Sequence, residues 1–121
     1  MALGRPTFQV RLDTRISLAD GGPVGDEADS VIEENLDHAM QELVSLGATD
    51  PRIDAAVVER GASFFVTVEA PNPIDASTAA SGLIRTAIHA AGGGTPDWPA
   101  PSSEAWLVRL LGVASHAVEL V

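Results

Sequence analysis

The chain of 121 residues contains no cysteine, no lysine and no tyrosine. Without cysteine it can have no disulfide framework, no thiolate nucleophile and no thiolate-based zinc site. Because lysine is absent, all seven basic residues are arginines, and they stand against seventeen acidic residues for a formal net charge of −10. A surface this negative repels phosphate backbones, so we expect no nucleic-acid partner, whereas a basic protein is a partner that it would attract.

Long apolar runs are missing as well. No uninterrupted apolar stretch approaches the roughly 20 residues that a membrane helix requires, and the first residues do not have the pattern of a signal peptide. We therefore expect a cytoplasmic protein without a membrane partner. The length and the 45% hydrophobic share fit a single α+β domain over residues 1–121 with one buried core.

Alternating apolar and polar residues predict the strands. Residues 7–16 alternate, and Phe8, Val10 and Leu12 share one face. Two further runs, 52–59 and 62–69, meet at the segment Arg60-Gly61-Ala62, which predicts a hairpin with Gly61 in its turn. Residues 115–121 have the pattern of a last strand. Residues 104–112 fit either a short helix or a strand, and we favour a helix or an irregular segment there.

Two segments have the signals of capped helices. Ser30 and Glu33 form an S-x-x-E capping-box pattern, and the helix that they open would end at Gly47. Asn72 is a suitable N-cap, with Pro73 in the first helical position, and three glycines at 92–94 would end this second helix. These glycines follow a helix instead of opening one, so they do not predict a phosphate-binding loop. We expect a flexible acidic loop over 17–29 and a proline-rich loop over 95–103.

The order of these elements, βαββαβ, resembles the ferredoxin-like sandwich. The resemblance implies an α+β fold with two layers: an antiparallel four-stranded sheet in the order 4-1-3-2, with both helices on one face. Residues 84–99, "IRTAIHAAGGGTPDWP", are also similar to small uncharacterised proteins of high-GC bacteria and their phages. Neither resemblance implies an activity.

The uncovered face of such a sheet is the first candidate site, and the acidic first helix is the second. No catalytic residues and no cofactor are predicted, since the three histidines fall on three different elements. We expect a small, non-catalytic domain that binds proteins or forms a homodimer; the alternatives are a small-molecule-binding regulatory domain and, with less support, a small enzyme. The predicted contact residues are Arg11, Val58, Phe65 and Thr67 on the sheet and Glu33, Glu34 and Asp37 on the helix.

Overall fold

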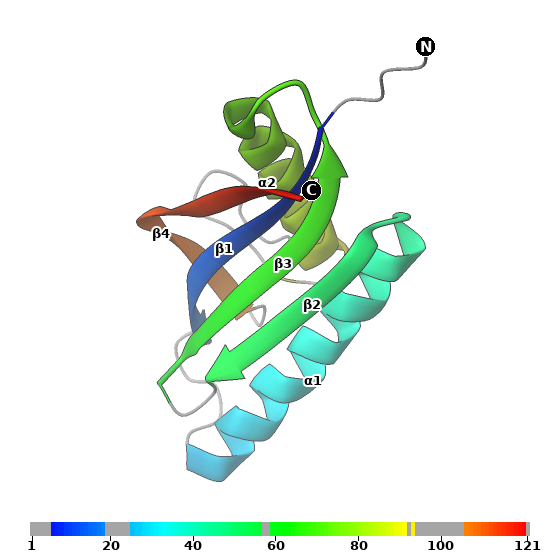
Figure 1. The fold of residues 1–121 in the computed structure, drawn as a ribbon. Helices are drawn as coiled ribbons and strands as arrows, with labels where there is room; N and C mark the ends of the chain where they lie inside the picture. The colour runs from blue at the N-terminus through cyan, green and yellow to red at the C-terminus, as the bar shows by residue number, and fades with distance from the viewer. Residues whose placement is uncertain (1–5, 19–24, 57–58, 92, 94–105, 121) are drawn as a thin grey trace.

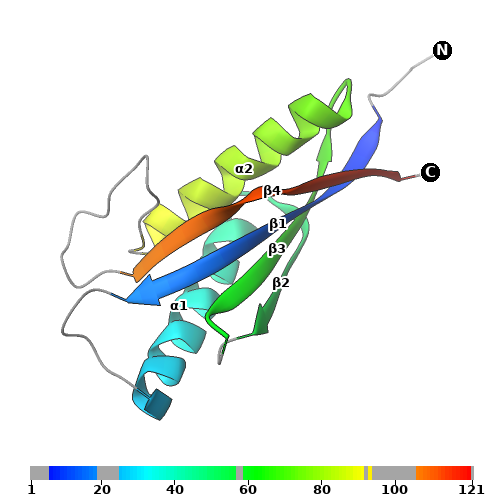
Figure 2. The same ribbon diagram turned by 90° about the vertical axis from the view of Figure 1, so that its left-hand side faces the viewer.

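A computed structural model describes residues 6–18, 25–56, 59–91, 93 and 106–120. They form one antiparallel four-stranded sheet and two helices, and both helices lie on the same side of the sheet (Figures 1 and 2). The sheet order β2-β3-β1-β4 is the predicted order 4-1-3-2, read from the opposite edge. The predicted α+β, ferredoxin-like topology is therefore confirmed. The elements are β1 (Thr7–Leu18), α1 (Gly25–Ser45), β2 (Thr49–Ala56), β3 (Gly61–Glu69), α2 (Pro73–Ala90) and β4 (Trp106–Leu120).

The core lies between the sheet and the two helices, and β1 runs through its centre. Even-numbered residues of β1 from Phe8 to Ile16 are buried, as period-2 alternation requires, and β3 contributes Phe64 and Val66 from the neighbouring strand. Thr14 is the one buried polar side chain described in this core, and its hydroxyl donates a 2.7 Å hydrogen bond to the carbonyl oxygen of Ala62. This bond offsets the cost of burying the hydroxyl group.

Helix α1 begins at Gly25, so the predicted start at Ser30 was wrong. Its buried stripe includes Ala28, one turn before Ile32, and Asp26 and Glu27 lie in the first turn, where the helix dipole favours acidic side chains. Ser30 consequently lies inside the helix. Of the loop expected over 17–29, residues 17–18 belong to β1 and 25–29 to α1, while 19–24 lie outside the described residues.

The end of α1 agrees with the prediction at Gly47. This glycine has a φ of +82°, a left-handed conformation that other residues adopt only with strain. The amide of Gly47 donates to the carbonyl of Val44, and the amide of Ala48 donates to that of Leu43. These two bonds form the Schellman motif, which satisfies carbonyl groups that the last turn leaves free.

Helix α2 was predicted correctly at its N-terminus. The side chain of Asn72 accepts a 2.9 Å hydrogen bond from the amide of Asp75, and Pro73 is the first helical residue. The buried stripe combines small residues with two isoleucines, so the helix packs closely on the sheet. The helix ends at Ala90, just before the predicted glycines, of which Gly92 and Gly94 lie outside the described residues. The stripe consists of Ala76, Ala80, Ile84, Ala87 and Ile88.

The hairpin between β2 and β3 differs from the prediction by a few residues. Strand β2 begins at Thr49 and ends at Ala56, and Gly61 is the first residue of β3 instead of a turn residue. Arg60, one of the two described residues of this connection, has a positive φ of 59°. The register of β2 on β3 shifts between Thr49 and Arg52, where Asp50 has a φ of 46°. Val58, one of the predicted contact residues, lies outside the described residues.

The last segment is a single strand, β4, so the preference for a helix or irregular structure over 104–112 was wrong. Strand β4 pairs antiparallel with the full length of β1, from Thr7↔Leu120 to Leu18↔Trp106. The register shifts at the middle, where 111–114 of β4 lie opposite a single residue of β1. Because β4 pairs with β1 on both sides of this irregularity, the segment is one strand, whereas its local sequence pattern suggests two separate elements. The proline-rich loop expected over 95–103 lies outside the described residues.

Candidate interaction surfaces

The outer face of the sheet, the one that the helices do not cover, is centred on Phe65. In the sheet register Phe65 of β3 lies between Arg11 of β1 and Arg52 of β2. The guanidinium carbon of Arg52 is 4.0 Å from the centroid of the Phe65 ring, a cation–π contact. Phe65 is only 9% exposed, so this predicted contact residue lies on the predicted face but is largely covered.

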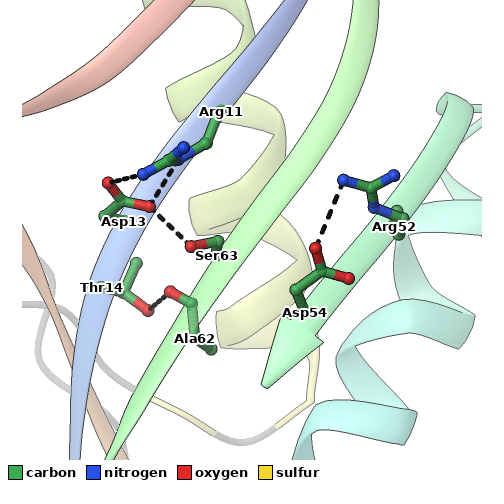
Figure 3. A network of polar contacts seen from close by, with 7 residues as sticks. All are labelled: Arg11, Asp13, Thr14, Arg52, Asp54, Ala62 and Ser63. Atoms are coloured by element: carbon green, nitrogen blue, oxygen red, sulfur yellow. Dashed lines mark hydrogen bonds and ion pairs between the residues drawn. The ribbon is translucent and has the colours of Figure 1, made fainter. Parts of the chain in front are cut away.

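Charged groups on this face are paired with one another (Figure 3). Arg11 donates two hydrogen bonds of 2.9 Å to the carboxylate of Asp13, which also accepts a 2.6 Å bond from the hydroxyl of Ser63. The hydrogen bond and the negative charge of Asp13 raise the pKa of Arg11 above its ordinary value. On β2, Arg52 lies 3.3 Å from Asp54. The face therefore carries both signs of charge in mutually compensating positions.

Two exposed apolar side chains extend this face at the β4 edge. Val118 is 61% exposed and Leu120 is 44% exposed. In the register they pair with Gln9 and Thr7, which lie on the outer side of β1. The sequence pattern does not single them out, because an alternating terminal strand gives no indication of which face its neighbours leave open. Thr67, which was selected, is half-buried and pairs with Gln9 on the same face.

The predicted acidic residues of α1 lie on the other side of the sheet. Glu33, Glu34 and Asp37 are all exposed, and the structure does not bring them together with Arg11, Phe65 and Thr67. The two predicted contact regions thus lie on opposite sides of the sheet (Figure 2), and they approach each other at the edge of β2, where Arg52 is close to both. Glu33 and Asp37 lie one turn apart on one side of the helix, beside β2, where they line a hollow described below that Glu34 does not line.

A hollow of about 260 Å³ lies between α1 and the edge strand β2. Its apolar lining comes from both elements, and two carboxylates of α1 stand beside that lining. No sequence pattern indicates this site, since only the tertiary structure brings the polar border of α1 next to β2. The residues that line it are Glu33, Leu36, Asp37 and Met40 of α1 and Arg52, Ile53 and Ala55 of β2.

A second hollow, of about 370 Å³, is lined by Arg15, Ile16 and Ser17 of β1 and by Arg60. The guanidinium of Arg60 is 2.5 Å from the carboxylate of Asp29. This ion pair ties the β2–β3 connection to the first turns of α1, so it has a structural role.

The histidines do not assemble a metal site in the part of the chain that the structure describes. His38 is 3.5 Å from Glu42, one turn further along α1. His89 is partly buried, and this burial, together with the positive charge of Arg85, lowers its pKa below the ordinary value. The side chain of His116 lies outside the described part.

No protein-family model, no curated protein and no solved structure matches the chain. The ferredoxin-like assignment therefore rests on the strand order and the connections between strands. Neither α1 nor α2, the two helices of the described residues, is long and apolar enough to cross a membrane.

Proposed function

We propose that the protein is a non-catalytic interaction domain that self-associates through the outer face of its sheet. The observation that carries this proposal is the unequal distribution of charge between the two sides of the molecule. Helix α1 has no lysine or arginine and holds a large share of the acidic residues of the chain, namely Asp26, Glu27, Asp29, Glu33, Glu34, Asp37 and Glu42.

The outer face, in contrast, is electrically balanced among its described side chains. With a net charge of −10, two copies of the chain repel each other most strongly where their acidic helices would meet. The balanced face avoids this repulsion, and a second copy of it presents cations to carboxylates and carboxylates to cations. The charged residues of this face are Arg11, Arg15 and Arg52 against Asp13, Asp54 and Glu69.

The size of the face and its apolar residues fit a two-fold dimer. Four strands about 4.8 Å apart and nine residues long, as β3 is, give a flat area of roughly 600 Å². A standard interface buries about 800 Å² per partner, which is close to this area. Val118 and Leu120 would contribute apolar contact area, and in a two-fold dimer both copies would bring this same pair of residues to the interface.

The test is the mass of two matched valine variants in solution. Val118 on the outer face and Val44 on α1 are 61% and 60% exposed, so that Val118→Asp and Val44→Asp make the same chemical change at similar exposure. We expect Val118→Asp to weaken self-association at least about tenfold, which corresponds to about 1.4 kcal/mol, because it places like charges at the interface. Val44→Asp should associate as the parent protein does.

Sedimentation velocity over a concentration series would measure both variants, with circular dichroism as the check on folding. Equal masses for Val118→Asp and the parent protein would contradict the proposal. So would a loss of association in Val44→Asp that matches the loss in Val118→Asp.

A further inference from the structure

We propose that the groove between α1 and β2 binds an extended, cationic peptide segment of another protein. The segment adds a strand to the free edge of β2 and places a lysine or arginine side chain in the hollow of about 260 Å³. This site lies at the sheet edge beside the helices, so the inference goes beyond self-association through the outer face and does not depend on it.

The backbone of β2 supplies the first element of recognition. Within the described residues β2 pairs only with β3, so its other side is an open edge with free amide and carbonyl groups. Asp50 and Pro51 fall in the register shift at the start of the strand, and Pro51 has no amide to donate. From Arg52 to Ala56 the pairing with β3 is regular, which leaves five residues that can accept a further strand.

The lining of the hollow supplies the second element. Leu36 and Met40 of α1 and Ile53 of β2 provide apolar contacts for the methylene groups of a long side chain. Glu33 and Asp37 stand at the same hollow, and neither forms an ion pair with any described residue. An apolar stem with a cationic end, the chemistry of lysine and arginine, matches this combination.

Arg52 also lines the hollow, but its ion pair is with Asp54 and not with Glu33 or Asp37. Its guanidinium group lies over the ring of Phe65 and 3.3 Å from Asp54. No other cation is available on α1, which has neither lysine nor arginine. The negative charge of the whole chain further favours a cationic partner over a second copy of this acidic protein.

The test uses a fluorescent heptapeptide of alternating threonine and valine with one central arginine, and measures its anisotropy with the full chain. The double variant Glu33→Gln/Asp37→Asn removes the two carboxylates of the hollow. Its control, Glu34→Gln/Asp26→Asn, makes the same two chemical changes at exposed positions of α1 that do not line the hollow. We expect the first double variant to weaken binding about tenfold or more and the control to change it less than about threefold.

Three results would overturn the proposal. One is equal weakening by both double variants, which would mean that only the general acidity of α1 attracts the peptide. Another is equal binding of a peptide with glutamate at its centre. The last concerns two peptides in which alternate amides are N-methylated, one peptide for each of the two alternating sets. Strand addition requires one of these sets, so an unchanged affinity of both peptides would contradict it.

Amide chemical shifts and the Val118→Asp variant separate this site from the self-association surface. We expect the peptide to shift the amides of residues 52–56, and we expect Val118→Asp to bind it with unchanged affinity. Two results would mean that the groove binds a second copy and that the peptide proposal is wrong. One is loss of peptide binding in Val118→Asp. The other is a change of self-association in Glu33→Gln/Asp37→Asn without any change of peptide affinity.

Discussion

At the scale of single residues, Arg52 has two roles on the outer face. Its guanidinium group covers the ring of Phe65, and the same group lies near the carboxylate of Asp54. A cation–π contact at an exposed site contributes about 0.5–1 kcal/mol, and an exposed ion pair contributes about 0–1 kcal/mol. The contact with the aromatic ring is therefore at least as important to stability as the ion pair that accompanies it.

Replacing Arg52 tests this ranking. We expect Arg52→Ala to lower the free energy of unfolding by about 0.5–1.5 kcal/mol, since it uncovers Phe65 as well as removing a charge. The control is Arg15→Ala on β1, an exposed arginine of the same face that has no aromatic contact among the described residues; its effect should stay within about 0.5 kcal/mol. Urea titrations would measure both, and equal effects at the two positions would refute a special role for the aromatic contact.

The exposure of Phe65 also marks a limit of sequence reasoning at this scale. Alternation along β3 correctly predicts which side of the strand Phe65 occupies. It does not reveal that Arg52 lies directly opposite in β2, because the cross-strand register depends on where the hairpin turns. The turn includes Arg60 in a left-handed conformation, which nothing in the residue type predicts.

At the scale of the elements, the two helix N-termini provide a matched comparison. Asn72 caps α2 through a 2.9 Å side-chain hydrogen bond, whereas Ser30, which has the pattern of a cap, lies within α1. We expect Asn72→Ala to lower the free energy of unfolding by about 1 kcal/mol. Ser30→Ala should be neutral or stabilising by up to about 0.5 kcal/mol, because alanine is the better residue in a helix interior.

Thermal and urea unfolding of the two variants would decide where α1 begins. A loss of about 1 kcal/mol in Ser30→Ala would mean that this serine is a cap after all, as the sequence alone suggested. A neutral Asn72→Ala would likewise contradict the capping geometry at α2.

Most of the fold could be predicted because its main signals are local. The alternation in β1, the N-cap at Asn72 and the glycine at the end of α1 each act within a few residues, and all three were predicted correctly. The errors arose where tertiary packing decides. The first turn of α1 is stabilised by burying Ala28, and β4 is a single strand because it pairs along all of β1. Neither the burial of Ala28 nor the pairing of β4 with β1 can be predicted from the pattern of residues within one segment.

The candidate sites could be predicted less well than the fold. The acidic residues of α1 were identified, but only the packing of α1 beside β2 separates Glu33 and Asp37, which line the hollow, from Glu34, which does not. Val118 and Leu120 were missed, since their exposure depends on their place at the edge of the sheet. Sites of this kind combine residues from separate elements, so the pattern within one segment does not define them.

At the scale of the whole molecule, charge is distributed unevenly between the helical side and the outer face of the sheet. On the basis of an acidic helical side and a balanced sheet face we propose two contacts on two surfaces: a second copy on the sheet and a cationic peptide at the edge of β2. Higher salt screens both, but the peptide should be affected more, because its binding depends on attraction to carboxylates that have no described partner.

The most direct test of self-association through the sheet is the distance between spin labels on two copies of the chain. Because the chain has no cysteine, a single introduced thiol can be labelled without side reactions. Glu69→Cys places the label on the outer face, and Glu34→Cys is the matched change on exposed α1. Pulsed electron paramagnetic resonance should give a defined intermolecular distance for Glu69. The distance for Glu34 should exceed about 20 Å, since a helix layer about 10 Å thick intervenes in each copy. The absence of a defined distance at Glu69 at any concentration, or a Glu34 distance below about 20 Å, would contradict self-association through the sheet.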